Sequence, residues 1–346
     1  MMRTTASDRP RVVALGGGHG LYASLSALRL LDVDVTAVVT VADDGGSSGR
    51  IRRELGVLPP GDLRMALAAL ATGRIGTGPR QPSLSWADVL QHRMGGAGAL
   101  AGHPIGNLLL TGLMEMHDDA VSALDDLAVL VGARGRVLPM SPRPLDLIAE
   151  VVSVDRDDPV HIRRIRGQSS IAATPGRVRS ISVVPENPPA CAEAVQALSR
   201  ADVVILGPGS WFTSVIPHLL VPDLADALVR TRAGLITILN LEPQVGETDD
   251  FSPEEHLRVL TEHCPALRIA AVIAGTDSVY DPHSLRRFTD GLGARLVLAP
   301  VATAGDPARH DPSRLSRAIA EAGLNGEFRE ANPQDSGVPA HGRGIV

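Results

Sequence analysis

The sequence predicts an α/β protein: a Rossmann-like, mostly parallel sheet with helices on both faces and one inserted antiparallel segment. Short runs rich in Val, Ile and Leu alternate with longer helical patterns, which is typical of a parallel sheet covered on both faces. The first apolar run passes through a glycine-rich turn directly into a helical stretch. Between about residues 142 and 190 the sequence changes to arginine-rich segments with β-type alternation, which indicates the insertion.

Each predicted strand is a short apolar run bounded by turn residues, and each predicted helix carries apolar residues at helical spacing. The predicted strands are Val12–Leu15, Val35–Val41, Val137–Met140, Ile181–Val184, Val203–Leu206, Leu235–Leu241, Ile269–Ile273 and Leu296–Leu298. The predicted helices are Leu21–Leu31, Asp62–Ala71, Ile105–Met116, Ala120–Gly132, Ala192–Arg200, Ser210–Leu220, Pro253–His263, Pro282–Gly291 and Pro312–Ala322. The Gly- and Ser-rich stretch 43–50 is expected to be a polar loop, and 73–85 a surface loop.

The chain of 346 residues has the length of one large domain or about two smaller ones. We interpret residues 11–300 as a single nucleotide-binding domain that carries the insertion at about 142–190. A C-terminal helix is expected within 301–322. Residues 323–346 are polar and Gly- and Pro-rich without any periodicity, so this tail is expected to be disordered.

The composition excludes several classes of function. A net charge of −6 and an aromatic content of 2% argue against a nucleic-acid-binding surface. All 33 basic residues are arginine, and a Walker-type phosphate loop or Schiff-base chemistry would need lysine. Cys191 and Cys264 stand far apart, so neither a disulfide framework nor a zinc site is indicated. The N-terminus lacks an apolar stretch and no apolar run approaches ~18 residues, so we expect a cytoplasmic protein without a membrane span.

A first candidate site is the turn after the first predicted strand. It consists of Gly16, Gly17, Gly18, His19 and Gly20. Glycines let the backbone approach a diphosphate, and the free N–H groups at the start of the following helix attract anions. The spacing is not that of the dinucleotide fingerprint, so a plain tight turn is the alternative.

A second candidate follows the second predicted strand, at the same edge of the sheet. Asp43 and Asp44 come first, and Ser47, Ser48 and Arg50 follow. An acid at this place often binds a ribose hydroxyl, and adjacent carboxylates can hold Mg²⁺ bridged to phosphates. Both interpretations stay open, as does an ordinary turn with solvated charges.

Two further segments place polar residues at the starts of predicted helices. Asp62 is interpreted as a helix N-cap or a ligand contact, while Arg64 opposes the dipole of the same helix and suggests a nearby anion. His103 and Asn107 flank the start of another predicted helix, where the histidine is expected to titrate low. A structural role is the alternative for each of these residues.

A second glycine turn follows the strand Val203–Leu206. It consists of Gly207, Pro208, Gly209 and Ser210. Two such turns in one sheet favour a nucleotide-sized ligand more than either turn alone. The sequence lacks an HExxH motif and a cysteine in a His-rich context, so we predict a binding site with no catalytic residue.

Several segments resemble one known family. These are ALGGGHGLYASLSALR, VVTVADDGGSSGRIRRELGVLPPGDLRMALAALA, GHPIGNLLLTGL, RVLPMSP and LGPGSWFTSVIPHLLV. In this order they strongly resemble the YvcK family, also called the gluconeogenesis factor family, from about Arg11 to Leu298. That family is related to CofD, the 2-phospho-lactate transferase of deazaflavin coenzyme synthesis.

The resemblance implies a Rossmann-like fold that binds a nucleotide-sugar, typically UDP-N-acetylglucosamine, and that supports cell-wall synthesis and cell shape on gluconeogenic carbon sources. It brings no established enzymatic activity; cell-wall synthesis proteins are the implied partners, and a homodimer has family precedent. In CofD relatives the acids matching Asp43 and Asp44 lie at the nucleotide and metal site. The second glycine turn and the residue matching Asn240 face the same cleft.

The alternative function is a Mg²⁺-dependent, CofD-like phospholactate or nucleotidyl transferase. Two departures count against it: this chain has Gly61–Ala66 where the transferase carries an aspartate- and threonine-containing segment, and Ser210–Trp211 where it has an Asn-Pro pair. Glu242 is also atypical of the family loop that follows Asn240. An NAD-dependent dehydrogenase is a weaker third hypothesis, because the first glycine turn lacks the dinucleotide spacing.

Overall fold

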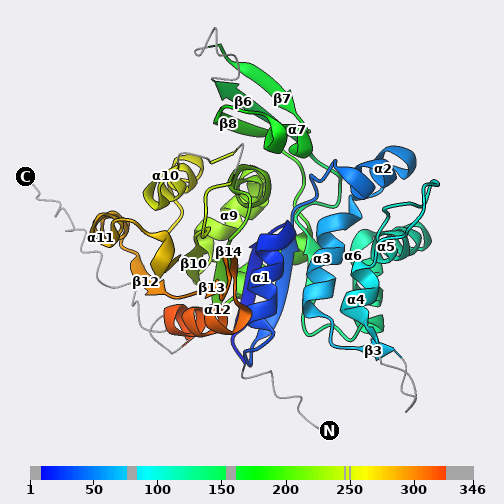
Figure 1. The fold of residues 1–346 in the computed structure, drawn as a ribbon, viewed down its shortest axis with the longest axis horizontal. Helices are drawn as coiled ribbons and strands as arrows, with labels where there is room; N and C mark the ends of the chain where they lie inside the picture. The colour runs from blue at the N-terminus through cyan, green and yellow to red at the C-terminus, as the bar shows by residue number, and fades with distance from the viewer. Residues whose placement is uncertain (1–8, 76–83, 153–160, 245–246, 249–250, 325–346) are drawn as a thin grey trace, which may run out of the picture.

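The computed structural model describes residues 9–75, 84–152, 161–244, 247–248 and 251–324. Its centre is a parallel sheet of seven strands in the order β12-β11-β10-β9-β1-β2-β5 (Figure 1). The strands are β1 (Arg11–Gly16), β2 (Asp34–Val39), β5 (Arg136–Pro139), β9 (Val203–Leu206), β10 (Gly234–Ile238), β11 (Ala271–Gly275) and β12 (Arg295–Ala299). The order reverses between β1 and β9, and ligands of open α/β sheets bind at such a switch point, beyond the carboxyl ends of the strands.

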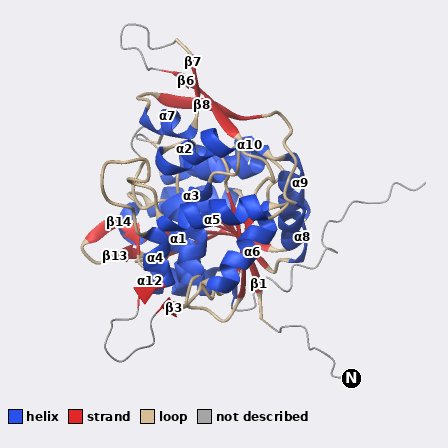
Figure 2. Cartoon of the chain, turned by 90° about the vertical axis from the view of Figure 1, so that its right-hand side faces the viewer, coloured by secondary structure: helices blue, strands red, loops and turns tan. Residues whose placement is uncertain are grey.

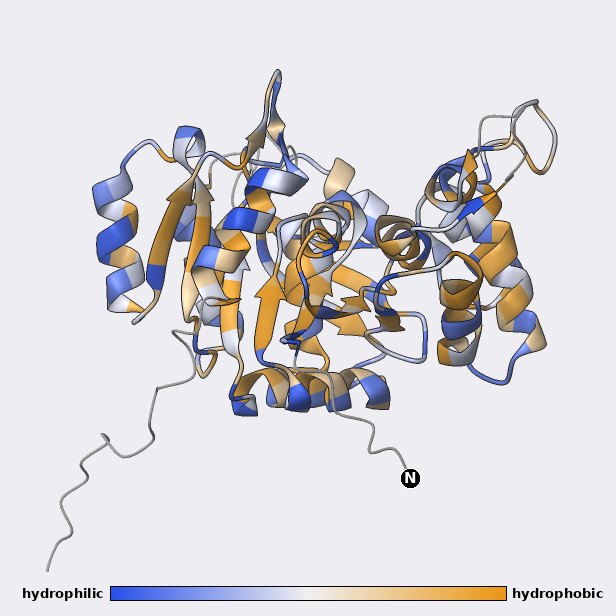
Figure 3. Ribbon diagram, turned by 90° about the horizontal axis from the view of Figure 1, so that it is seen from below, coloured by the Kyte–Doolittle hydropathy of each residue, from blue (hydrophilic) through white to orange (hydrophobic). Residues whose placement is uncertain are grey.

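Helices cover both faces of this sheet, as Figure 2 shows, so the predicted fold class is confirmed. One face carries α1 (Gly18–Leu28), α3 (Pro60–Leu70) and α12 (Pro312–Ile319), and the other carries α8 (Ala192–Arg200) and α9 (Pro222–Arg230). The central strands are buried along their length and apolar in Figure 3, because a strand covered on both faces has no solvent side. The helices α10 (Pro253–His263) and α11 (Pro282–Gly291) flank the β11–β12 side.

The connection from β2 to β5 forms a group of helices at one end of the molecule (Figure 1). Besides α3, it contains α2 (Gly46–Leu55), α4 (Trp86–Gln91), α5 (Ile105–Met116) and α6 (Ala120–Leu130). The short strands β3 (Arg74–Ile75) and β4 (Leu84–Ser85) pair within the predicted surface loop, whose residues 76–83 lie outside the described residues.

The predicted insertion is an antiparallel sheet in the order β7-β6-β8, which lies above the carboxyl edge of the large sheet in Figure 1. Its elements are β6 (Asp146–Val152), β7 (Arg163–Arg166), α7 (Gln168–Ala173) and β8 (Arg177–Val184). Of these strands only part of β8 was predicted. Arg52 connects α2 to the insertion, because its Nη2 donates to Asp146 Oδ1 of β6 over 2.6 Å.

Two predicted elements need correction. The stretch 43–50 is a loop only as far as Gly45. The helix α2 begins at Gly46, because Ser47, Ser48 and Ile51 are buried against the neighbouring helices. The predicted helix Ser210–Leu220 is a π-helical turn, η1 (Trp211–Val215), followed by a 3-10 turn, η2 (Ile216–Leu220), since Pro217 cannot supply an N–H to a regular helix.

The C-terminal helix α12 is preceded by a hairpin of β13 (Ala302–Thr303) and β14 (Asp306–His310) that was not predicted. The remaining short turns are η3 (Thr276–Ser278) and η4 (Ala320–Leu324). Residues 325–346, most of the expected disordered tail, lie outside the described residues. Among the described residues no single helix is long and apolar enough to cross a membrane; Trp211–Leu220 and Pro222–Arg230 reach that length only as a pair bent by 82°.

Candidate functional site

Both glycine turns lie at the switch point and touch each other there. A Cβ atom on Gly20 would lie 2.0 Å from the carbonyl oxygen of Pro208, so only glycine fits at this contact. Asn240 fixes the second turn, because its amide Oδ1 accepts from the Gly209 N–H (2.8 Å) and its Nδ2 donates to the Gly209 carbonyl (2.9 Å). Both polar side-chain atoms of Asn240, which was predicted to contact the ligand, therefore hydrogen-bond to the turn and position it.

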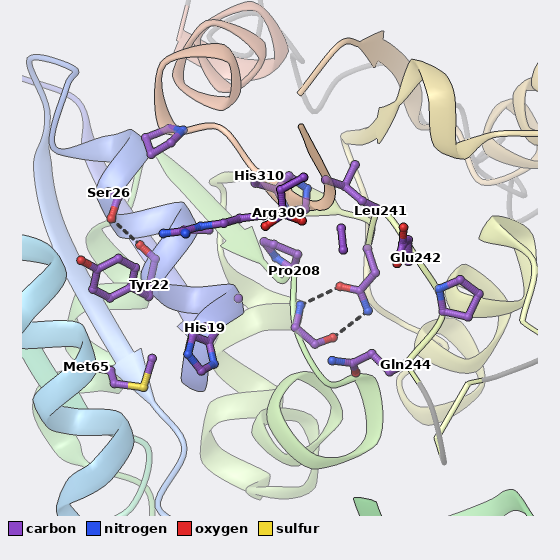
Figure 4. Close-up of a pocket in the computed structure, with 18 of the residues that line it drawn as sticks. His19, Tyr22, Ser26, Met65, Pro208, Leu241, Glu242, Gln244, Arg309 and His310 are labelled. Carbon is purple, nitrogen blue, oxygen red and sulfur yellow. Dashed lines mark hydrogen bonds between the residues drawn. The ribbon is translucent and has the colours of Figure 1, made fainter. Parts of the chain in front are cut away.

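A cleft of two lobes opens at this junction. The first, here called the hairpin lobe, has a volume of about 650 Å³ and lies between α1, the loop after β10 and β14 (Figure 4). The second, here called the acidic lobe, has a volume of about 350 Å³ and lies beneath α7. Four residues line both lobes, so the lobes meet at the glycine turns: His19, Gly20, Gly209 and Gln244.

The hairpin lobe combines apolar surfaces with polar groups that have spare hydrogen-bonding capacity. Tyr22, Pro208 and Leu241 supply the apolar part, and Arg309 extends across the lobe toward α1 (Figure 4). Burial lowers the pKa of His310 to about 4, so its ring is neutral, and its buried Nε2 has no partner. Such a lobe can hold a planar, partly polar group.

The acidic lobe is lined mainly by hydroxyl, amide and carboxylate groups. Glu247 is 4% exposed and accepts hydrogen bonds from Ser210 Oγ (2.6 Å) and Thr213 Oγ1 (3.1 Å). Burial raises the pKa of its carboxyl despite these bonds. Gln168 of α7 also lines this lobe, and its buried Oε1 has no partner. The lobe thus presents acceptors, which suit a ligand rich in hydroxyl groups.

The buried Asp62 and the half-buried Asp43 form an acid pair beneath the first glycine turn. A Cβ on Gly17 would lie 2.7 Å from Asp62 Oδ2, and one on Gly61 would lie 2.7 Å from Asp43 Oδ2. Burial, followed by the charge of Asp43, raises the pKa of Asp62 to about 7. Burial also raises the pKa of Asp43, although Ser48 and the Gly45 N–H donate to it.

This acid pair has the composition of a magnesium site. Mg²⁺ binds through one or two carboxylates and completes its shell with water and phosphate oxygens. Asp62 Oδ2 is buried without a partner, which leaves an acceptor for a cation or a proton. The described residues contain no group of three or more His, Cys, Asp or Glu side chains that could hold a metal, so ligand phosphates would have to complete the shell.

The predicted pairing of Asp43 with Asp44 is not what the structure shows. Asp44 turns toward the insertion, where its Oδ1 accepts from the Ser169 N–H at the start of α7 (2.9 Å). Asp62 takes its place beside Asp43. It is also not an N-cap, because α3 begins after Pro59 and the Asp62 carboxyl accepts from the Gly18 N–H instead.

Neither of the two predicted phosphate-binding arginines, Arg64 and Arg50, lines a lobe of the cleft. Arg64 is 5% exposed and its Nη1 donates to Oε1 of Gln91, which lines the hairpin lobe. Burial, and then the charge of Arg93, lowers its pKa to about 10. Arg50 instead holds the loop before α5 through the Ala101 carbonyl (2.9 Å), and it lines neither lobe.

Ser47, His103 and Asn107 meet in a buried cluster between α2 and α5. Ser47 Oγ lies 2.7 Å from His103 Nδ1 and accepts from Asn107 Nδ2 over 2.9 Å. The predicted low pKa of His103 is confirmed, with burial as its main cause and Arg50 as the second. None of the three residues lines a lobe. Their contacts join the two helices, and their role in ligand binding stays a prediction.

Comparison with known proteins places the chain in a family. The family model described as 2-phospho-L-lactate transferase CofD matches residues 12–292. A Mycobacterium tuberculosis protein classed with the gluconeogenesis factors is 53% identical over 315 residues, which cover 89% of each chain. The chain belongs to the CofD family, among its gluconeogenesis factors.

Two further relatives of this gluconeogenesis factor support the assignment. The gluconeogenesis factor of Listeria monocytogenes is 40% identical over 271 residues, which cover 78% of this chain and 79% of the relative. The crystal structure of a UPF0052 family member from Bacillus halodurans is 32% identical, with a TM-score of 0.78 over 91% of this chain and 99% of that one. The resemblance read from the sequence is therefore confirmed.

Proposed function

We propose that this gluconeogenesis factor binds a nucleoside diphosphate-sugar, with UDP-N-acetylglucosamine as the expected ligand. The observation that carries the proposal is the cleft at the switch point, where two lobes of different chemistry meet at two glycine turns. Their volumes lie in the range typical of small-molecule sites, roughly 300–1,000 Å³. Residues 16–20 and 207–210 would carry the diphosphate between the lobes.

The lining of each lobe supports one orientation of this ligand. The hairpin lobe, with Tyr22 and Leu241, fits the flat base, and its neutral His310 Nε2 can accept a hydrogen bond. The acidic lobe, with Asp43, Glu247 and Gln168, fits the sugar, because carboxylate and amide oxygens accept from hydroxyl groups. This arrangement places the sugar beneath α7 of the insertion.

A cation is expected to accompany the ligand. A diphosphate at the first glycine turn would lie beside the acid pair Asp43 and Asp62, and like charges in a buried place repel strongly. Mg²⁺ held by these two carboxyls would neutralise the pair and bridge it to the phosphates. Without the cation, Asp62 would have to stay protonated.

The proposed role is regulatory. Ligand binding would favour one arrangement of the insertion above the acidic lobe, which cell-wall synthesis proteins would recognise. The alternative is a Mg²⁺-dependent transferase of the kind named by the family model, and the acid pair is the observation that favours it. A reaction of the protein and Mg²⁺ with a guanylyl-lactyl donor and a deazaflavin acceptor separates the two, because only the transferase forms product.

Thermal unfolding against a ligand panel tests the proposal. We expect UDP-N-acetylglucosamine with Mg²⁺ at 100 times its Kd to stabilise the protein by about 2.7 kcal/mol, a shift of a few degrees at this size. Asp43→Asn should abolish the shift, while Asp226→Asn, an exposed helix carboxylate far along the chain, should keep it. A shift with GDP alone, or an unchanged shift in Asp43→Asn, would contradict the proposed ligand or its placement.

A further inference from the structure

The strand β7 of the insertion carries a concentration of positive charge. Residues 161–184 contain five arginines and no acidic residue, although the whole chain has a net charge of −6. Three of these arginines, Arg163, Arg164 and Arg166, belong to the four residues of β7, and all three are exposed. The insertion projects from the rest of the molecule in Figure 1. A surface with one sign of charge attracts a partner of the opposite sign.

Only one side of β7 is paired with a neighbouring strand. The sheet order β7-β6-β8 leaves its other side, here called the open edge, without a strand among the described residues. Gly167, the residue after β7, donates its N–H to the Leu147 carbonyl of β6 (2.8 Å). Because hydrogen-bonded and non-hydrogen-bonded pairs alternate along an antiparallel ladder, the backbone groups of Ile165 also face β6. The backbone N–H and C=O groups of Arg164 and Arg166 therefore point toward the open edge.

The side chains of Arg164 and Arg166 lie on the same face of the small sheet, because they are two residues apart in a strand. Arg166 shares the Asp146 carboxylate with Arg52, so one negative charge lies against two positive charges there. Arg164 lies opposite Glu150 of β6, whose carboxylate accepts from a β8 hydroxyl over 3.1 Å. Within the described part of the chain no ion pair joins these two residues. This face therefore keeps an excess of positive charge beside the backbone groups of the open edge.

We propose that the open edge of β7 binds an extended acidic segment of another protein, which joins the insertion as an additional strand. Its backbone pairs with the N–H and C=O groups of Arg164 and Arg166, and its acidic side chains, at alternate positions, lie opposite these two arginines. Unlike charges directly opposite each other stabilise a strand pair, and like charges destabilise it. A second copy of β7 would place arginine against arginine, so the edge disfavours its own copy. An aromatic content of 2% offers few bases a stacking surface, which favours a peptide over a nucleic acid.

A strand bound at the open edge lies close to the ligand cleft. The strand β7 continues through Gly167 into α7, and Gln168 of α7 lines the acidic lobe. A Cβ atom on Gly167 would lie 2.0 Å from Asp44 Oδ2, so this connection is tightly packed. The biological role of the inferred partner rests on the regulatory part of the proposed function, whereas the binding itself needs no ligand. The experiment is therefore done without nucleotide-sugar, so that a failure of the strand pairing is distinguishable from a failure of ligand binding.

Fluorescence anisotropy of a labelled synthetic peptide tests the proposal with the full chain. The peptide alternates glutamate with threonine, so that an extended conformation has one acidic face. We expect the wild type to bind it, and Arg164→Glu to weaken the Kd at least roughly tenfold, because the reversed charge replaces an attraction by a repulsion. Arg286→Glu on α11 is the matched control, since it makes the same charge change at an exposed arginine and should leave the Kd unchanged. Circular dichroism checks that both variants are folded.

A peptide with a modified backbone separates strand pairing from simple charge attraction. N-methylation of its glutamates removes the N–H donors that face β7 and keeps every charge, so we expect it to abolish binding to the wild type. Hydrogen exchange of residues 163–166 should slow with the unmodified peptide, because the N–H groups of the open edge become bonded.

Three results with the peptides overturn the proposal. These are a methylated peptide that binds as tightly as the unmodified one, an equal loss of affinity in Arg164→Glu and Arg286→Glu, and an acidic peptide that fails to bind at roughly 1 mM. Single-stranded RNA or anionic vesicles also overturn it if they bind more tightly than the peptide and lose affinity in Arg164→Glu, because the open edge then recognises a different class of partner.

Discussion

The two edges of the central sheet satisfy their polar groups in opposite ways. At the amino edge, the backbone N–H and the guanidinium of Arg11 donate to both carboxylate oxygens of Asp202 over 2.8, 3.1 and 3.0 Å. At the carboxyl edge, Asp62 Oδ2, Gln244 Oε1 and His310 Nε2 are buried without a partner. Among the described residues, the Arg11–Asp202 pair at the amino edge is thus fully hydrogen-bonded, whereas these three atoms at the carboxyl edge have no partner.

This difference distinguishes polar groups that stabilise the fold, at the amino edge, from polar groups that are available to a ligand, at the carboxyl edge. Buried polar groups in native proteins are nearly always hydrogen-bonded, because an unpaired one costs roughly 1–3 kcal/mol. Such groups gather at the carboxyl edge, where the cleft lies, and a bound ligand or cation would supply the missing partners. The comparison therefore predicts large ligand effects at the carboxyl edge and small, ligand-independent effects at the amino edge.

The largest effect is expected where the two glycine turns touch. Gly20→Ala places a Cβ 2.0 Å from the Pro208 carbonyl oxygen, so the turns must separate, and we expect a loss of more than about 3 kcal/mol of unfolding free energy. Gly291→Ala near the end of α11 is the matched control, since a Cβ there has no neighbour within 4 Å. Urea unfolding of both variants measures the contrast. Equal stabilities would show that the junction is not tightly packed.

Asp62 should give the fold a pH dependence. Its folded pKa is raised to about 7 from 3.8 by burial and by Asp43, while Arg64 acts against the shift. A raised folded pKa means that stability is complete below about pH 4 and is lost as the pH rises through about 7, at most about 4 kcal/mol at 1.36 kcal/mol per unit. Asp62→Asn should abolish this decline.

Urea unfolding between pH 5 and 8 in EDTA measures the difference between wild type and Asp62→Asn. The two curves should diverge as the pH rises, with the variant the more stable at pH 8. Addition of Mg²⁺ should restore the unfolding free energy of the wild type at pH 8 and leave that of the variant nearly unchanged, because only the carboxylate of Asp62 is stabilised by the cation. If the unfolding free energies of the two proteins change with pH in parallel, the pKa of Asp62 is not raised in the folded state.

Much of the carboxyl edge could be predicted from the sequence, because its signals are local. Apolar runs followed by glycine turns identified β1, β9 and the helix α1, whereas the helix predicted after β9 is instead the two turns η1 and η2. The helices α5, α8, α10 and α11 have the predicted bounds. The acid pair could not be predicted in the same way. Asp43 and Asp62 are far apart in sequence, and the neighbour Asp44 points elsewhere because adjacent side chains in a loop need not share a face.

The missed residues of the cleft share this non-local origin. Glu247 contributes through bonds to Ser210 and Thr213, 37 and 34 positions away, and Gln168 belongs to an insertion whose position over the switch point has no sequence signal. Arg309 and His310 reach the hairpin lobe from a strand near the C-terminus. The only sequence signal for Glu247 was its place in the family loop that follows Asn240.

Glu247 should distinguish sugar-bearing ligands from the free nucleotide. Glu247→Gln keeps the size of the side chain but weakens its acceptors, so we expect roughly tenfold weaker binding of UDP-N-acetylglucosamine, about 1.4 kcal/mol, and unchanged binding of UDP. Glu254→Gln on α10, which lines neither lobe, is the matched control and should bind both ligands as the wild type does. Calorimetric titration of both variants with both ligands measures the effect. An equal loss for UDP would place the nucleotide, instead of the sugar, in the acidic lobe.

The smallest effect is expected at the amino edge. Asp202→Asn removes the carboxylate that Arg11 contacts, yet the side chains are about half exposed, so water replaces the lost bonds. Exposed ion pairs contribute at most about 1 kcal/mol, and the bond to the Arg11 N–H can persist with the amide oxygen. Urea unfolding should show a loss within that limit, the same with and without nucleotide-sugar. A loss that the ligand reverses would mean that the two edges are coupled through β1 and β9, since these adjacent strands are the shortest path between the Arg11–Asp202 pair and the glycine turns.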